Sequence, residues 1–320
     1  MPGSLTSPAT TLHDFAAASP AFAALVRQGP IDWKAWDIAT DHLTQKMTGT
    51  PHLERRIHHW YLPVLFFCLA RLHCTISRPL MVGIQAPQGA GKTTMVTHLL
   101  SLLPILGLRG AAVSIDDFYL THEEQVRLAA KHPGNPYLEH RGYPGTHDIL
   151  LGEKTLTALS TISPGKTIFV PLYDKSAHGG RGDRAPMAEW RSVTGPLDMV
   201  LVEGWMLGFE KKPDTHLTDP RLISSNHALA AYDRWHALLH AFIVIRATDP
   251  SFVLRWRVEA EEEMKARGRP GLSREAIEDY VRRFLPAYDI WAGQAPARFF
   301  RNETFFMNLD EHRQPVNVGN

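Results

Sequence analysis

The stretch Leu80-Met-Val-Gly-Ile-Gln-Ala-Pro-Gln-Gly-Ala-Gly-Lys-Thr-Thr94 decides the fold of this chain of 320 residues. Its first six residues predict a short, mostly apolar strand, and the residues after Gly91 predict the start of an amphipathic helix. A glycine-rich turn between a strand and a helix points successive backbone N–H groups at phosphate oxygens, and the helix dipole adds positive charge there. The stretch therefore predicts a phosphate-binding loop.

The side chains of this loop suit a nucleoside triphosphate with Mg²⁺. Lys92 reaches the outer phosphates, and the Thr93 hydroxyl can ligate Mg²⁺. The first loop position is Ala86 instead of glycine, which is tolerable if the backbone is extended there. The residues expected to contact the nucleotide are Gln88, Gly89, Ala90, Gly91, Lys92, Thr93 and Thr94.

Composition sets mild limits on the possible partners and location. A chain that is 44% hydrophobic can bury one large core or two modest ones, and its net charge of +1 gives no case for nucleic acid or an anionic membrane. Cys68 and Cys74 form no disulfide framework, which indicates a reducing compartment. No basic and apolar leader is found, so we expect a cytoplasmic protein. The apolar run 61–70 contains Pro63 and is too short to span a bilayer, which predicts a buried helix.

The order of the predicted elements indicates an α/β fold with an open, doubly wound, mostly parallel sheet. Residues 1–78 are predicted to form a helical extension, frayed at its start and packed on the core, and residues 79–320 a P-loop domain. The predicted strands are 80–85, 111–115, 167–171, 198–203, 241–246 and 298–309, and several are continuous apolar runs typical of parallel sheets. The predicted helices are 93–103, 121–131, 148–159 and 251–267. The polar stretch 213–233 is interpreted as an insertion over one edge.

Two acidic motifs lie at predicted strand ends. Asp116 and Asp117 end the second strand, where a carboxylate can orient a hydroxyl acceptor and take its proton. We favour Asp116 as this base and Asp117 as the second choice, against an Asx turn or helix cap. Glu203 ends another buried strand before Gly204. A carboxylate there can hold a Mg²⁺-bound water or polarise the acceptor, so Thr93 and Glu203 are the predicted metal ligands.

Polar loops between these strands offer many hydrogen-bond donors. The runs 137–148 and 171–184 suit a small, anionic, hydroxylated acceptor, because arginine binds a carboxylate through two parallel hydrogen bonds. The alternative is a solvated loop whose charges pair with one another. The residues expected to bind the acceptor are Asp116, Asp117, Tyr119, Arg141, His147, Tyr173, Lys175, Arg181 and Arg184.

The segment 251–271 is predicted to be an arginine-bearing helix followed by a flexible turn. Such a helix can close over the phosphates and supply an arginine to the transition state, and we assign Arg255 to this catalytic role. The alternative is that Arg255 pairs with Glu259 on a solvated helix face. The 17 histidines show no metal-binding spacing, and His58 and His59 are expected to pack within a helix.

Taken together, these motifs resemble the plant and fungal type of D-glycerate 3-kinase, within the P-loop group that includes uridine kinase, phosphoribulokinase and bacterial pantothenate kinase. The resemblance covers about residues 80–320. Its most specific parts are Tyr173-Asp-Lys-Ser176 and Glu203-Gly-Trp-Met-Leu-Gly208. The other matching motifs are Ala86–Thr94, Ser114–Thr121, Arg141–Asp148 and Gly180–Arg184.

The resemblance implies transfer of the ATP γ-phosphate to D-glycerate, giving 3-phosphoglycerate. It also implies that Lys92, Thr93 and Thr94 serve ATP and Mg²⁺, that Asp116 is the base and that Glu203 is the second acidic residue. Two alternatives stay open. One keeps the kinase chemistry with another acceptor, such as another hydroxy acid, a nucleoside or pantothenate. The other is an ATPase switch protein, but an acceptor pocket explains the polar loops better. The sequence leaves the oligomeric state open.

Overall fold

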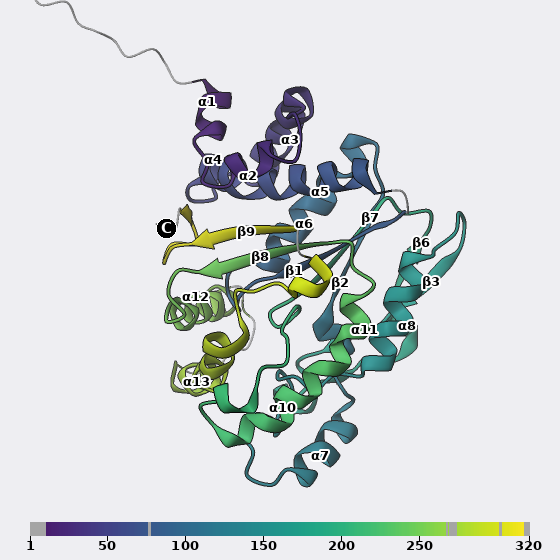
Figure 1. Cartoon of the computed structure of the whole chain (residues 1–320), viewed down its shortest axis with the longest axis vertical. Coiled ribbons are helices and arrows are strands. Elements are labelled where there is room, and N and C mark those ends of the chain that lie inside the picture. Colours follow the sequence, from purple (N-terminus) through teal and green to yellow (C-terminus); the bar gives the residue numbers. More distant parts are fainter. Residues whose placement is uncertain (1–10, 76–77, 267, 269–273, 301–302, 317–320) are drawn as a thin grey trace, which may run out of the picture.

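The computed structural model describes residues 11–75, 78–266, 268, 274–300 and 303–316, and its centre is a six-stranded sheet (Figure 1). The strand order is β10-β9-β8-β1-β7-β2, and every neighbouring pair is parallel except β10 with β9. The strands are β1 (Leu80–Gln85), β2 (Gly110–Ser114), β7 (Met199–Gly204), β8 (Ala241–Ala247), β9 (Thr304–Leu309) and β10 (Pro315–Val316). The expectation of a doubly wound, mostly parallel α/β sheet is confirmed.

The sheet is buried on both faces, which explains the continuous apolar runs of its strands. Leu80, Val82 and Ile84 of β1 belong to one core cluster, and Met81, which points to the opposite face, belongs to the other. Successive residues of a strand alternate between faces, so a single apolar run supplies both cores.

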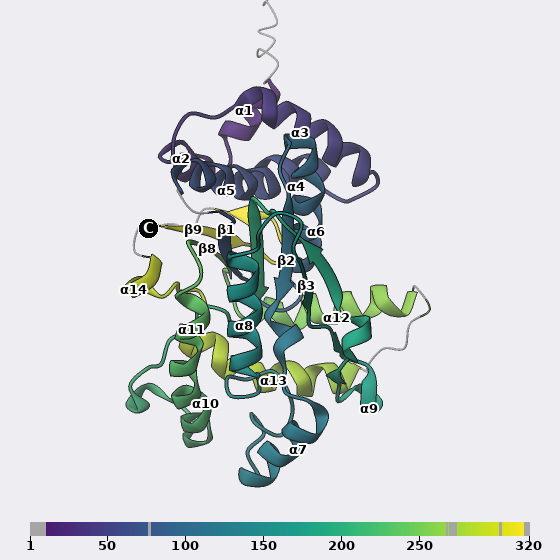
Figure 2. The same cartoon turned by 90° about the vertical axis from the view of Figure 1, so that its right-hand side faces the viewer.

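The first core cluster joins the N-terminal helices to the sheet (Figures 1 and 2). Trp36 and Trp60 are fully buried in it, and α5 contacts both β1 and β8. The apolar run predicted as a buried helix is the π-helical turn Ile57–Tyr61 continued by α5, with Pro63 in the first turn, where proline is tolerated. The other helices here are α1 (Leu12–Ala17), α2 (Phe22–Val26), α3 (Trp33–Lys46), α4 (Leu53–Arg56), α5 (Leu62–Cys74) and α6 (Lys92–Leu102).

The second core cluster covers the opposite face of the sheet, where α8 and α11 lie (Figure 2). Thr121 and Asp148 cap α7 and α8 through their side chains, so these predicted helices begin where the sequence indicates. The helices after α6 are α7 (His122–Lys131), α8 (Ile149–Ser160), α9 (Ala177–Gly180), α10 (Ile223–Ala228), α11 (Asp233–His236), α12 (Phe252–Ala266), α13 (Arg274–Trp291) and α14 (Ala297–Phe300). In the described residues, no helix has the length and apolar character needed to cross a bilayer.

Two of the sequence predictions need correction. The strand predicted at 167–171 exists as β3 (Thr167–Val170), but it pairs antiparallel with β6 (Arg191–Thr194) in a separate two-stranded sheet, and Phe169 is 57% exposed. The strand predicted at 298–309 begins only at Thr304, because Ala297–Phe300 form α14. The sequence analysis did not predict α13, and the flexible turn expected after α12 lies largely outside the described residues.

Candidate active site

The loop between β1 and α6 has a backbone suited to phosphate binding. Gly89 and Gly91 have φ angles of +76° and +90°, which side chains rarely tolerate. A Cβ on Gly89 would also lie 2.8 Å from the Cβ of Trp256 in α12, so α12 packs directly against the loop. Ala86 is fully buried and is not among the described residues with a positive φ, which agrees with an extended backbone there.

Glu203, at the end of β7, contacts the phosphate-binding loop through its side chain. It lies opposite Ile84 in the parallel pairing of β7 with β1, at the end of the sheet where the loop begins. Its Oε2 is 3.0 Å from Nζ of Lys92, and its Oε1 accepts a hydrogen bond of 3.3 Å from the Thr93 hydroxyl. Glu203 is buried, and the ammonium group of Lys92 compensates its charge.

The Thr93 hydroxyl and the Glu203 carboxylate fit a magnesium ion that arrives with a nucleotide. Mg²⁺ keeps several waters and takes phosphate oxygens, so one or two protein groups are enough to hold it. Among the described residues, no group of three or more His, Cys, Asp or Glu side chains could hold a metal alone. The arrangement therefore suits a metal bound together with phosphates better than a resident metal.

Asp116 and Asp117 follow β2 in a short 3₁₀ turn, Ile115–Phe118, which Ser114 caps. Their side chains have different partners. Asp116 pairs with Lys175 at 2.5 Å. Asp117 pairs with Arg191 of β6 at 3.0 Å and accepts a hydrogen bond of 3.3 Å from the backbone N–H of Tyr173. Asp117 thus holds two neighbouring segments in place, whereas Asp116 lies among cations of the site.

The pKa values of the two aspartates move in opposite directions. Burial by itself would raise the pKa of Asp116, but Lys175, with help from Lys92, outweighs it and holds the pKa below its usual value. Burial raises the pKa of Asp117, and the Arg191 guanidinium offsets only part of this. Neighbouring cations therefore favour the ionised form of Asp116, whereas burial disfavours the ionised form of Asp117.

The loop 171–184 forms a small hairpin of β4 (Tyr173–Asp174) and β5 (Asp183–Arg184) beside Asp116. The Arg141 side chain donates hydrogen bonds to the backbone carbonyls of Lys175, Gly180 and Arg181, and its guanidinium lies over the Tyr173 ring. The structure thus places near one another residues predicted to bind the acceptor from three separate segments, 116–119, 137–148 and 171–184.

The three predicted arginines differ in what they contact. Arg141 fastens the hairpin, and Arg184 donates to the Asp148 carboxylate at 3.1 Å and to the Tyr119 carbonyl at 3.2 Å. Arg181 is exposed, and its guanidinium has no partner among the described contacts. The clamp remains a prediction, in which Arg181 is the arginine still available to an incoming acid.

Arg255 lies on α12 and contacts carboxylates. Its Nη1 is 2.8 Å from Glu311 and its Nε is 3.9 Å from Glu259. In this structure, Arg255 is therefore paired with carboxylates, as in the alternative to the catalytic role. The arginine that touches the phosphate-binding loop is Arg313, which the sequence analysis did not single out. Its Nε donates to the Gly89 carbonyl at 2.8 Å. Arg313 comes from the turn between β9 and β10, and no local motif marks it.

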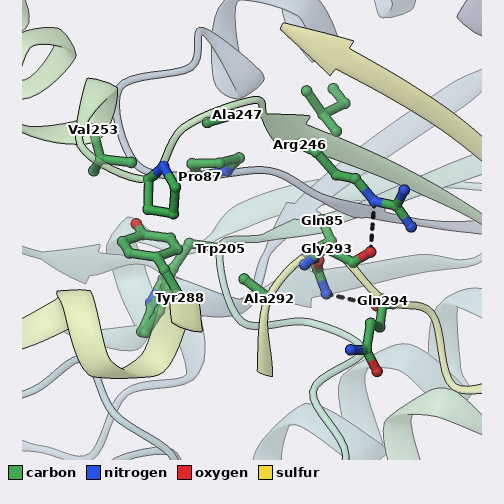
Figure 3. Close-up of a pocket in the computed structure, with 12 residues that line it drawn as sticks. Gln85, Pro87, Trp205, Arg246, Ala247, Val253, Tyr288, Ala292, Gly293 and Gln294 are labelled. Atoms are coloured by element: carbon green, nitrogen blue, oxygen red, sulfur yellow. Dashed lines mark hydrogen bonds between the residues drawn. The ribbon is translucent and has the colours of Figure 1, made fainter. Parts of the chain in front are cut away.

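A cavity of about 380 Å³ lies at the ends of β1 and β8, beside the start of the phosphate-binding loop (Figure 3). Pro87, Val253, Trp205 and Tyr288 give it apolar walls, and Arg246 is the charged residue of its lining. The Nε of Arg246 donates to the Gly293 carbonyl at 2.6 Å. Ligands of doubly wound sheets bind at this edge, beyond the carboxyl ends of the strands.

Comparisons with known proteins agree with this geometry, although no protein-family model matches the chain. The chain is 41% identical over 277 residues, 82% of its length, to the chloroplastic D-glycerate 3-kinase of Arabidopsis thaliana, and it spans 61% of that protein. It is 34% identical over 252 residues, 75% of its length and 91% of the other, to the uncharacterized kinase mug58 of Schizosaccharomyces pombe. A solved D-glycerate 3-kinase from Cryptococcus neoformans superposes with a TM-score of 0.73 and 31% identity, covering 81% of this chain and 98% of that one.

The sheet, the phosphate-binding loop and Glu203 define an ATP-dependent P-loop kinase for a small molecule. Within this class, the chain belongs to the D-glycerate 3-kinase family, to which its motifs and the similar solved structure both point.

Proposed function

We propose that this protein transfers the γ-phosphate of ATP to D-glycerate and releases 3-phosphoglycerate. The observation that carries the proposal is the position of Asp116. Its carboxylate lies against Lys175 of the acceptor hairpin and close enough to Lys92 of the phosphate-binding loop for both cations to lower its pKa. A base between the two halves of the site is what transfer to a hydroxyl requires. The names of the Arabidopsis and Cryptococcus relatives support glycerate as the acceptor.

In this proposal, each residue has a task that follows from its chemistry. Asp116 orients the acceptor hydroxyl and takes its proton as the new O–P bond forms. Lys92 and the backbone N–H groups of the loop stabilise the charge on the phosphates, and Glu203 holds Lys92 and Thr93 in place. A magnesium ion bound at Thr93 and Glu203 would neutralise phosphate charge.

The cations around the acceptor loops favour an acid over an uncharged nucleoside. Lys175, Arg181 and Arg184 lie on the hairpin; Lys175 pairs with Asp116 and Arg184 with Asp148, while Arg181 is exposed. A carboxylate gains from this charge, while a nucleoside base does not. The alternative within the same fold is another small hydroxy acid, which these contacts would also bind.

Magnesium dependence and a cytoplasmic location belong to the same proposal. Cys68 and Cys74 are both free thiols, which fits a reducing compartment. Removing divalent metal with EDTA should abolish turnover, and excess Mg²⁺ should restore it. Cell fractionation of the native protein would test the location.

The direct test is ADP release by the purified protein with Mg-ATP and one acceptor per reaction: D-glycerate, L-glycerate, uridine or pantothenate. We expect turnover with D-glycerate alone, and none with Lys92→Ala, which lacks the cation that stabilises the transferring group. Activity with another acceptor only would keep the kinase and refute the substrate. ADP release that ignores every acceptor would favour the ATPase alternative.

A further inference from the structure

His147 lies in the acceptor site on a segment that is fastened to the one carrying Asp116. The Asp148 N–H donates to the Phe118 carbonyl at 2.7 Å and the Leu120 N–H to the Thr146 carbonyl at 3.0 Å. This pairing stacks the His147 ring on Tyr119, with centroids 4.3 Å apart. The position of His147 relative to Asp116 is therefore fixed by backbone hydrogen bonds.

The hydroxyl of Tyr232 determines which nitrogen of His147 carries the proton. This hydroxyl accepts a hydrogen bond of 3.1 Å from the Gly145 N–H and lies 2.8 Å from Nδ1 of His147. Tyr232 is 1% exposed, so its O–H needs an acceptor inside the protein, and among the described residues Nδ1 of His147 is the acceptor at hydrogen-bond distance. The O–H therefore donates to Nδ1, and the proton of the neutral ring is on Nε2.

The Nε2–H of His147 is left without a partner. Nε2 is a buried atom with no hydrogen bond in the structure, and His147 as a whole is 4% exposed. Burial lowers the pKa of His147 to about 3, although Asp116 acts in the opposite direction, so the ring stays neutral at ordinary pH. A buried donor without a partner is unfavourable, and an oxygen of a bound ligand would satisfy it.

We propose that Tyr232 is a positioning residue, which fixes His147 as the Nε2–H tautomer so that the ring donates a hydrogen bond to an oxygen of the acceptor acid. This inference rests on the proposed function, because it assigns the donor to the acceptor side of that site. Tyr232 lies near the end of the stretch 213–233, which the sequence analysis interpreted as an insertion. This stretch would then help to orient His147.

The kinetic test compares Tyr232→Phe with Tyr137→Phe. The Tyr137 hydroxyl bonds Asp219 at 2.8 Å and does not touch His147, so both variants lose one hydrogen-bonded hydroxyl from the same side of the molecule. We expect Tyr232→Phe to raise the acceptor KM roughly tenfold, as one lost hydrogen bond to a charged oxygen would, while the ATP KM stays within about twofold. Tyr137→Phe should change neither value by more than about twofold. An unchanged acceptor KM in Tyr232→Phe would overturn the proposal.

A second variant pair and a spectrum separate positioning from simple packing. The amide nitrogen of His147→Gln takes about the place of Nε2, and that of His147→Asn about the place of Nδ1, so glutamine should retain more acceptor affinity. In ¹⁵N NMR with labelled histidine, the signals lost in His147→Gln identify this ring. We expect them to show a protonated Nε2 in the wild type and to change in Tyr232→Phe.

A protonated Nδ1 in the wild-type spectrum would contradict the assignment. Because the spectrum needs no substrate, this result is independent of whether D-glycerate is the acceptor. If another acid proves to be the substrate, the same KM comparison is made with that acid.

Discussion

At the scale of single residues, the two adjacent aspartates after β2 have separable roles. Asp116 faces Lys175, while Asp117 is held by Arg191 and the Tyr173 backbone. We expect Asp116→Asn to lower kcat at least ~100-fold, because the amide cannot take the proton. Asp117→Asn keeps an oxygen for the Tyr173 N–H and should cost less than about tenfold. Steady-state kinetics of both variants is the check, and the reverse ranking would make Asp117 the base.

The charge around Asp116 also predicts a pH effect. Burial raises the pKa of this carboxyl and Lys175 lowers it, with the net value below normal. In Lys175→Met the burial remains without its main compensation, so the pKa of Asp116 rises and the acid limb of the kcat profile moves to higher pH. Lys166→Met, which changes an exposed lysine, is the control. An unmoved acid limb would show that Asp116 does not set it.

The sequence analysis identified residues that belong to a local sequence motif next to a predicted strand. Lys92, Thr93 and Glu203 follow predicted strands, and the carboxyl ends of parallel strands meet at one edge, so their proximity was predictable. Tyr232 and Arg313 reach the site from segments with no motif, through contacts between residues distant in the chain. Such contacts depend on tertiary packing, which a single sequence does not display.

At the scale of elements, the turn between β9 and β10 fastens α12 against the phosphate-binding loop. Arg313 donates to the Gly89 carbonyl, to the Trp256 carbonyl at 3.2 Å and to the Glu259 carboxylate at 2.6 Å. The Trp256 indole N–H donates to the Glu311 carbonyl at 2.8 Å. The helix α12, which the sequence analysis predicted to close over the phosphates, is therefore held by residues near the C-terminus. Any movement of α12 away from the loop would have to break these hydrogen bonds.

We expect Arg313→Met to raise the ATP KM roughly tenfold and to leave the acceptor KM within about twofold, because the lost contacts all lie at the nucleotide loop. Arg313 has a φ of +58°, so exchange for another long side chain adds no new backbone strain. Arg298→Met, which removes pairs with Glu210 and Asp233, serves as the control in the same assay. Equal rises in both KM values would mean that the turn supports the whole fold instead of the loop.

Elements were predicted well where they are long and regular, and poorly where pairing partners are distant. The strands β1, β7 and β8 agree with the sequence pattern to within one residue or so. The strand β3 was predicted, but its antiparallel partner β6 was not. About twenty residues, including β4 and β5, separate the two strands, and local periodicity does not reveal such a pairing.

At the scale of the whole molecule, we propose that the described N-terminal residues 11–75 complete the core of the kinase domain. The Trp60 ring packs against the phosphate-binding loop, since a Cβ on Gly91 would lie 3.4 Å from this ring. We expect Trp60→Ala to cost about 3–5 kcal/mol of unfolding free energy. It should also raise the ATP KM. Thermal unfolding, with the exposed Ile38→Ala as control, is the measurement. A separate low-temperature transition that leaves the ATP KM unchanged would show that the extension is independent.

The central claim is phosphoryl transfer to the terminal hydroxyl of D-glycerate, and the product of the reaction tests it most directly. The purified protein is incubated with Mg-ATP and D-glycerate, and the product is examined by proton-coupled ³¹P NMR. A phosphate on the CH₂ carbon couples to two protons with similar coupling constants and gives a triplet-like signal, whereas a phosphate on the CH carbon couples to one proton and gives a doublet. The account predicts the triplet of 3-phosphoglycerate growing as ATP is consumed. The doublet of 2-phosphoglycerate, or inorganic phosphate alone, would contradict it.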